Sequence, residues 1–114
     1  SVTGEQFQVT PEVEAVAKTS REYAQGTFTL DPTKIKDGSA IKIGDTTYVF
    51  AVGKNSKFKD YDGAVDLTEF EKLTASEAGI VSQRLAAAAK NNKNFYVGSN
   101  LNDGTISLTE KVSY

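Results

Sequence analysis

The sequence predicts a small α+β domain in which an antiparallel β-sheet, built from hairpins, packs on one main helix. Two segments of alternating apolar and polar residues, each interrupted by a glycine–aspartate turn pair, predict the hairpins. An alanine-rich segment between them has apolar residues at helical spacing. The predicted elements are strands at about 26–30, 40–50, 94–98 and 104–111 and a helix at about 75–90.

The first 25 residues allow two interpretations. Thr10 followed by Pro11 has the form of a helix N-cap and first helical residue, and Val13 and Val16 then fall at helical spacing. Val13, Ala15 and Ala17 also alternate, as in a strand. We favour an extra helix at 11–24. Residues 1–25 are then either a separate appendage or a connecting segment of a single domain, 1–114, and the first residue, Ser1, suggests that this domain is excised from a longer chain.

The alternation is strongest at 40–50. If Gly44-Asp45 forms a two-residue turn, Ile43 pairs with Thr46 and Ile41 pairs with Tyr48. Directly opposite residues share a face of the sheet. The core-facing residues of this hairpin are therefore predicted to be Ile41, Ile43, Tyr48 and Phe50.

The other elements follow the same logic. Phe28 and Leu30 alternate with two threonines, and the alanine-rich helix starts between Thr74 and Ser76, with Ser76 as a candidate cap. Its predicted apolar stripe consists of Ala78, Val81, Leu85 and Ala88. The second hairpin has Asp103-Gly104 in its loop and turns four apolar residues toward the same core: Phe95, Val97, Ile106 and Leu108.

The composition excludes several kinds of chemistry. The chain has no cysteine and no histidine, so disulfides, thiolate nucleophiles and histidine acid–base catalysis cannot occur in it. Its net charge of −2, from 13 basic and 15 acidic residues, gives no basic field for nucleic acid or an anionic membrane. We therefore expect no catalytic residue, no cofactor, no nucleic-acid partner and no membrane partner.

The acidic segment after Phe58 partly matches a calcium-binding EF-hand loop. In that alignment the candidate ligands are Asp60, Asp62, Asp66 and Glu69. The first ligand position is Phe58, which has no oxygen to offer, and the segment before it has the pattern of a strand where an EF-hand has a helix. We favour a simpler interpretation, an acidic turn before a short segment whose apolar residues close the core.

Lysines and tyrosines form the remaining surface candidates. Lys54, Lys57 and Lys59 surround Phe58, a pattern too small for a nucleic-acid platform and better explained as a solvated loop. Three tyrosines are candidate contact residues for another protein: Tyr23, Tyr61 and Tyr96.

The hairpin Ile41–Phe50, the alanine-rich helix and the segments Phe95–Val97 and Asp103–Lys111 together resemble the hairpin–helix–hairpin modules in the variable region of bacterial flagellins and related hook-associated proteins. This resemblance covers roughly residues 26–112. It implies a structural, non-catalytic, surface-exposed domain of a secreted filament protein of the bacterial flagellum, with a role in the motility apparatus. Its partners would be other copies of the parent subunit and host or cell-surface ligands. A phage-tail or cell-surface adhesion module of the same fold is the alternative.

Overall fold

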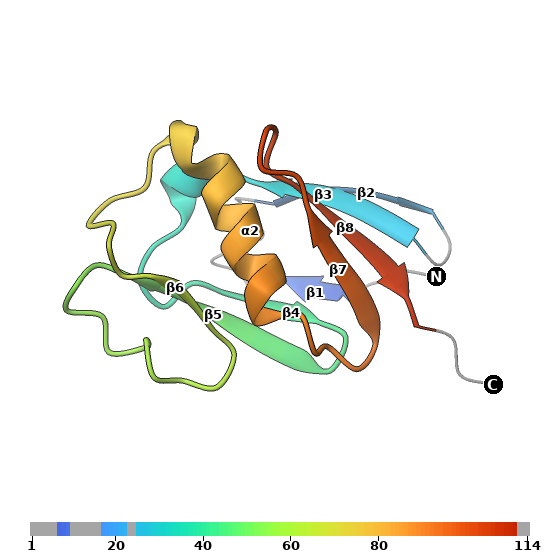
Figure 1. Cartoon of the computed structure of the whole chain (residues 1–114), viewed down its shortest axis with the longest axis horizontal. Helices are drawn as coiled ribbons and strands as arrows, with labels where there is room; N and C mark the ends of the chain where they lie inside the picture. The colour runs from blue at the N-terminus through green and yellow to red at the C-terminus, as the bar shows by residue number, and fades with distance from the viewer. Residues whose placement is uncertain (1–6, 10–16, 23–24, 112–114) are drawn as a thin grey trace.

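The computed structural model describes residues 7–9, 17–22 and 25–111 (Figure 1). The chain order of the elements is β1 (Phe7–Val9), β2 (Ala17–Glu22), β3 (Gln25–Leu30), the 3-10 turn η1 (Pro32–Lys34), β4 (Ala40–Ile43), β5 (Thr46–Val52), β6 (Ala64–Leu67), the 3-10 turn η2 (Ala75–Glu77), α2 (Ala78–Ala88), β7 (Phe95–Ser99) and β8 (Thr105–Glu110). The predicted α+β class, with hairpin strands packed on one main helix, is confirmed.

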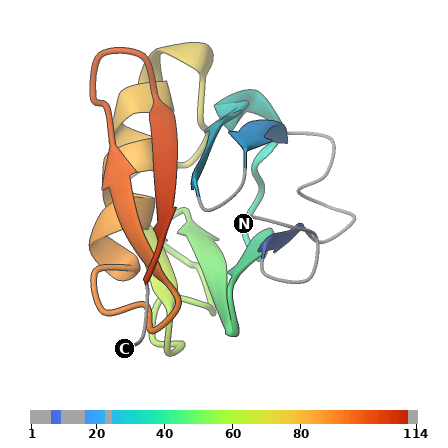
Figure 2. The ribbon, with the colours of Figure 1, turned by 90° about the vertical axis from the view of Figure 1, so that its right-hand side faces the viewer.

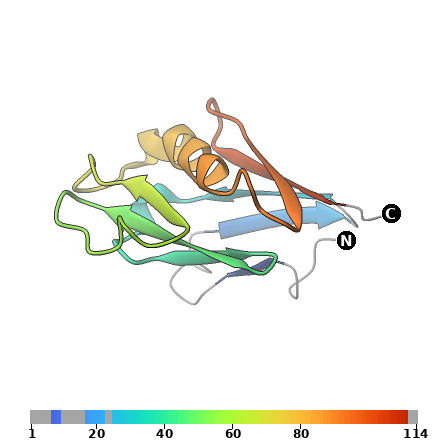
Figure 3. The same ribbon diagram turned by 60° about the horizontal axis from the view of Figure 1, so that its bottom comes forward.

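The strands form two sheets instead of one. The first has the order β1-β4-β5-β6 and the second has the order β2-β3-β8-β7. The neighbouring strands are antiparallel except for β5 and β6, which are parallel. Figure 3 shows α2 and the β7–β8 hairpin on one side of the molecule and the β4–β5 hairpin on the other. The sequence pattern shows which face of a strand is apolar, but not which strand lies beside it.

The β4–β5 hairpin has the predicted register. Ile43 pairs with Thr46 and Ile41 pairs with Tyr48 around the Gly44-Asp45 turn. Gly44 has a φ of +63°, a left-handed conformation that glycine adopts without steric cost. All four predicted core residues of the hairpin, including Phe50, are 2% exposed or less. The two-residue turn fixes the register, and the register fixes the buried face.

The β7–β8 hairpin is also confirmed. Val97 pairs with Leu108, and the strand β8 pairs on its other side with β3, where Phe28 lies opposite Ile106. The side chains of Phe28, Ile106 and Leu108 are buried, whereas Val97 is partly buried. Strand β8 is therefore central in its sheet, and β7 forms one of the sheet's edges.

The helix begins where the sequence predicted, with a different cap. The carboxylate of Glu77 accepts the backbone N–H of Thr74 at 2.7 Å, which makes Thr74 the capping position in place of Ser76. Val81 and Leu85 are fully buried as predicted, but Ala78 and Ala88 are half-buried, and Gly79 and Ala89 turn inward instead. Figure 2 shows α2 directly behind the β7–β8 hairpin. The helix contacts β6 of the first sheet and β3, β7 and β8 of the second, so it joins the two sheets.

The predicted helix at 11–24 is wrong for residues 17–22, which form strand β2. This strand pairs along its whole length with β3, from Ala17 opposite Leu30 to Glu22 opposite Gln25. The free edge of β3 supplies hydrogen-bond partners that override a weak local preference for helix. Residues 11–16 and 23–24 lie outside the described residues. Strand β1 pairs with β4, so each sheet includes one strand from the first 25 residues.

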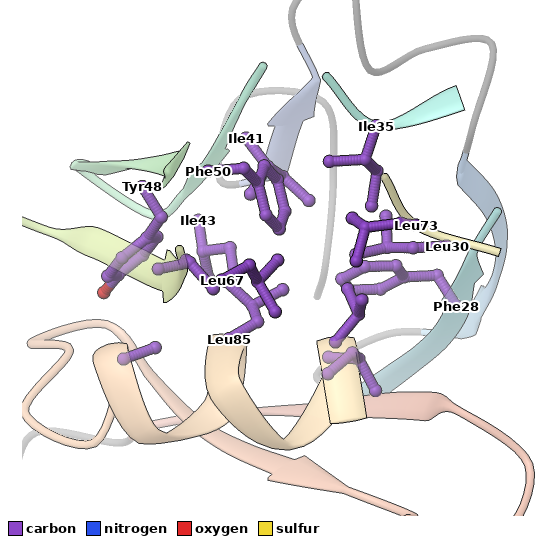
Figure 4. Packing of buried hydrophobic residues seen from close by; sticks show 14 of the residues in the cluster. Phe28, Leu30, Ile35, Ile41, Ile43, Tyr48, Phe50, Leu67, Leu73 and Leu85 are labelled. Atoms are coloured by element: carbon purple, nitrogen blue, oxygen red, sulfur yellow. The ribbon is translucent and has the colours of Figure 1, made fainter. Parts of the chain in front are cut away.

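One apolar core lies between the two sheets and the helix (Figure 4). Leu85 of α2 points toward Ile43 of β4 and Leu67 of β6. Near the other end of the helix, Phe28 and Leu30 of β3 lie beside Leu73. Strands from both sheets, the helix and two residues of the connecting segments, Ile35 and Leu73, thus contribute to a single core.

Candidate functional site

The loop between β5 and β6, residues 53–63, carries most of the polar side chains singled out in the sequence. Its anchor is Asp37, which lies in the turn before β4. One Asp37 carboxylate oxygen accepts the backbone N–H of Val52 at 3.0 Å and the hydroxyl of Ser56 at 2.5 Å. The Ser56 hydroxyl also accepts the backbone N–H of Phe58 at 3.1 Å. Asp37 therefore holds the start of this loop against the first sheet.

A hollow of about 580 Å³ lies beside the Phe58 ring. The ring packs on Gly38, where an added Cβ would lie 2.9 Å from a ring carbon. The hollow is lined by Thr33, Lys34, Lys36, Asp37, Gly38, Ser39 and Phe58. A second hollow of about 300 Å³ shares Thr33, Lys36 and Asp37 with it. An aromatic ring with exposed lysines around it can hold a polar or anionic group, although the lysines expected to surround Phe58 do not line this hollow.

The acidic segment does not have the helix–loop–helix elements of an EF-hand. Residues Ala64–Leu67, which would be the middle of that loop, form strand β6 and pair with β5. The segment before the loop is β5 itself, where an EF-hand has a helix. Within the described parts of the chain, no three acidic side chains come together as metal ligands.

Two of the four candidate calcium ligands have structural partners. Glu69 makes a two-point ion pair with Arg84 of α2, at 2.9 and 2.7 Å, and Arg84 also donates to the Asp66 backbone carbonyl at 2.7 Å. These hydrogen bonds lower the pKa of Glu69 and raise the pKa of Arg84. The carboxylate of Asp66 accepts the hydroxyl and the backbone N–H of Thr68, and these bonds lower its pKa. Asp60 and Asp62 lie exposed in the loop.

The remaining pKa shifts also favour ionised carboxylates. The backbone N–H of Thr74 lowers the pKa of Glu77 at the start of the helix, and the backbone N–H of Thr105 lowers the pKa of Asp103 in the β7–β8 loop. A general acid near neutral pH needs the opposite shift, which burial or a second carboxylate would produce. The acidic residues with shifted pKa values in the described segments are therefore suited to holding turns and ion pairs.

The candidate contact tyrosines belong to different parts of the fold. Tyr61 is 56% exposed and meets the Phe58 ring edge-on, with 5.2 Å between ring centroids. Tyr96 on β7 is 64% exposed, and the Lys111 ammonium lies 4.9 Å from its ring centroid. Tyr23 lies outside the described residues. Tyr61 lies in the β5–β6 loop, whereas Tyr96 lies on β7, at the edge of the second sheet.

Asn92 is the most connected polar residue that sequence reasoning missed. Its amide nitrogen donates to the Ile43 carbonyl and the Tyr48 hydroxyl, each at 2.9 Å. Its amide oxygen accepts the backbone N–H groups of Asn94 and Phe95 at 2.8 and 2.9 Å. The side chain is 3% exposed and fully satisfied. It joins the β4–β5 hairpin to the start of β7.

Comparisons with known proteins supply no relative for this chain. No protein-family model matches it, and neither the curated proteins nor the solved structures include a match.

The helices in the described part of the chain are too short or too polar to cross a membrane.

Proposed function

We propose that this chain is a structural, non-catalytic, surface-exposed module of a flagellin-like filament protein, part of the bacterial motility apparatus outside the cell. The observation that carries the proposal is the role of the segments that resemble flagellin modules. The β4–β5 hairpin, α2 and the β7–β8 hairpin build one shared core and are joined at Asn92. The similarity therefore lies in the part of the chain that determines the fold.

The polar groups support the same proposal. Glu69 and Arg84 fasten the helix to the segment after β6, Asp37 fastens the β5–β6 loop, and Glu77 caps the helix. Each of these groups has a structural partner within the fold. The domain would therefore act through its surface and its shape, without a cofactor.

The partners would be other copies of the parent subunit in a filament. Large apolar side chains that are more than half exposed are candidates for such contacts: Tyr61, Tyr96 and Leu101. They lie on the β5–β6 loop, on β7 and on the β7–β8 connection. Host or cell-surface molecules would meet the same outer surface.

The alternative is a phage-tail or cell-surface adhesion module, and the hollow beside Phe58 favours it. Aromatic rings next to lysines and hydroxyls are suited to binding sugars, because the ring stacks on the sugar and the polar groups orient it. Tyr61, which extends from the same loop, would widen this surface.

Immunogold electron microscopy on the producing cells, with antibody raised against this chain, tests the proposal. Label along the length of the flagellar filaments is the expected result. Label confined to a filament tip, a phage tail or the cell wall would contradict it and support capping or adhesion.

A binding assay tests the adhesion alternative directly and so distinguishes it from the filament proposal. The purified chain is sedimented with cell-wall polysaccharide, alongside Tyr61→Ser and, as a matched control at the other exposed tyrosine, Tyr96→Ser. The filament proposal predicts no binding by any of the three. Binding that Tyr61→Ser loses and Tyr96→Ser keeps would establish the adhesion alternative.

A further inference from the structure

The described chain contains three aspartate–glycine steps, which are sites of a spontaneous main-chain reaction. The nitrogen of the glycine can attack the side-chain carboxyl carbon of the preceding aspartate, because glycine has no Cβ to obstruct the approach. The reaction requires a glycine N–H and a carboxyl group that are both free to move. The three steps are Asp37-Gly38, Asp62-Gly63 and Asp103-Gly104.

At the first step, Asp37-Gly38, hydrogen bonds restrain both reacting groups. The Gly38 nitrogen donates to the Phe50 carbonyl at 2.8 Å. The carboxylate of Asp37 accepts from the Val52 backbone and from the Ser56 hydroxyl. Reaction at this step would break hydrogen bonds to β5, the strand at the centre of the first sheet.

The third step is held in the same way. The nitrogen of Gly104 donates to the Asn100 carbonyl at 2.8 Å, and the carboxylate of Asp103 accepts the Thr105 backbone N–H at 2.8 Å. Gly104 is also buried against Ala78 of the helix, where an added Cβ would lie 2.9 Å from the alanine side chain. The packing leaves the Gly104 nitrogen little freedom to approach the carboxyl carbon.

At the second step, Asp62-Gly63, neither reacting group is held by a hydrogen bond from the described residues. Asp62 is exposed, and within the described segments neither its carboxylate nor the Gly63 N–H has a hydrogen-bond partner. The carbonyl of Gly63, by contrast, accepts the Val49 N–H at 3.1 Å. Gly63 has a φ of +80°, and an added Cβ would lie 2.7 Å from the Thr47 carbonyl oxygen, so a larger residue does not fit here.

We propose that Asp62 is the site in this domain where the native protein spontaneously forms isoaspartate. The Gly63 nitrogen forms a bond to the side-chain carbonyl carbon of Asp62, and one water molecule is released to give a five-membered succinimide. Water then adds to either ring carbonyl. Addition at the side-chain carbonyl restores aspartate, and addition at the main-chain carbonyl gives isoaspartate, with no net gain or loss of atoms.

The product alters the start of β6. Isoaspartate routes the main chain through the side chain and so adds one methylene directly before the paired residues of this strand. Ala64 pairs with Val49 and Val65 pairs with Phe50, and Val65 is fully buried. The added length therefore disturbs the pairing register of β5 with β6, which the burial of Val65 in the core fixes. The modified domain would be less stable and would be a substrate for enzymes that methylate isoaspartate.

The test compares the three sites within one protein. The purified chain is incubated at neutral pH and physiological temperature for several weeks, digested, and analysed by a fragmentation mass spectrometry method that separates isoaspartate from aspartate. The same incubation in concentrated urea supplies the unfolded control. Since one hydrogen bond changes a local opening equilibrium by roughly fivefold, isoaspartate at position 62 should exceed that at 37 and 103 by roughly tenfold or more in the folded protein.

In urea the three sites should react at similar rates, because the hydrogen bonds that protect two of them are gone. Asp62→Glu should abolish the product at position 62 and leave the other two sites unchanged, because glutamate would have to close a six-membered ring. Equal reaction at the three sites in the folded protein, or faster reaction at 37 or 103, would overturn the proposal. Reaction at position 62 only in urea would overturn it as well.

Discussion

The two hairpins of this domain bury their residues to different extents. In the β4–β5 hairpin, Ile41, Ile43, Tyr48 and Phe50 are all 2% exposed or less. In the β7–β8 hairpin, Ile106 and Leu108 of the central strand β8 are 1% exposed or less, but Val97 of the edge strand β7 is only partly buried. Both segments alternate in sequence. Position within the sheet, and not the alternation alone, determines how much of a hairpin is buried.

The hairpins also differ in what fixes their ends. A two-residue turn closes β4–β5, whereas residues 100–104 connect β7 to β8 through a loop that packs against α2. An added Cβ at Gly79 of α2 would lie 1.8 Å from the Leu101 carbonyl oxygen. The turn of the first hairpin is also bonded from outside, since the Asp45 backbone N–H donates to the Asn94 side chain at 3.0 Å. The loop of the second hairpin depends on close contact with α2.

The largest expected effect is on the buried hairpin. Phe50→Ala removes a fully buried ring and should lower the free energy of unfolding by about 3–5 kcal/mol. Tyr96→Ala, on the exposed edge, should cost no more than about 1 kcal/mol, the scale of an exposed cation–π contact. Chemical denaturation of both variants measures the difference. Equal losses would remove the distinction between the hairpins.

Asn92 is the next largest expected effect, because it joins the two hairpins. Asn92→Ala leaves a buried carbonyl, a buried hydroxyl and two backbone N–H groups without their partner, and should cost about 2–4 kcal/mol. Its exposed neighbour provides the control, and Asn91→Ala should change stability by less than about 0.5 kcal/mol. If both substitutions were equally mild, the amide would not link the hairpins.

Two glycine substitutions test the dependence of the second hairpin on the helix. Alanine at Gly79 gains up to about 1 kcal/mol of helix preference, but its Cβ meets the Leu101 backbone, so we expect a net loss of about 1–3 kcal/mol. Gly98→Ala on β7 meets only the Ser107 hydroxyl, which can rotate away, and should change stability by less than about 0.5 kcal/mol. Thermal melts compare the two. A stabilised Gly79→Ala variant would show that the loop moves without cost.

The smallest effect concerns acid stability at the β7–β8 loop. The folded protein holds the pKa of Asp103 below its ordinary value of 3.8, chiefly through the Thr105 backbone N–H. The ionised carboxylate therefore contributes stability above that value and loses it as the pH falls through the folded-state pKa.

Asp103→Ser keeps an oxygen acceptor but removes this titration. The drop in melting temperature between neutral pH and pH values below 3.8 should be smaller in the variant than in the parent protein. An equal drop in both would mean that the Asp103 carboxylate does not stabilise the loop.

The sequence predicted those parts of the fold that depend on local pattern. The register around Gly44-Asp45, the buried face of β4–β5 and the Val81–Leu85 face of the helix all follow from residue spacing. The division into two sheets depends on pairing between distant segments, as in the pairing of β3 with β8. The same is true of β2, whose weak helical pattern is overridden by an available strand edge.

The candidate site was less predictable. The spacing of the acidic residues suggested calcium ligands, but it could not show that Glu69 reaches Arg84, fifteen residues away in the sequence. The roles of Asn92 and Asp37 were not predicted, because their hydrogen-bond partners lie in other elements of the fold. Tyr61 and Tyr96 are exposed, as contact residues must be, and their contact with another protein stays a prediction.

Native-state hydrogen exchange tests the central claim most directly, namely that the two hairpins, joined by α2 and Asn92, form a single cooperative unit. The slowest amides of β5 and β8, one central strand from each sheet, should exchange with the same free energy, equal to that of global unfolding. If the β8 amides exchanged at a clearly lower free energy than those of β5, the second hairpin would open independently, and the account of one shared core would be contradicted.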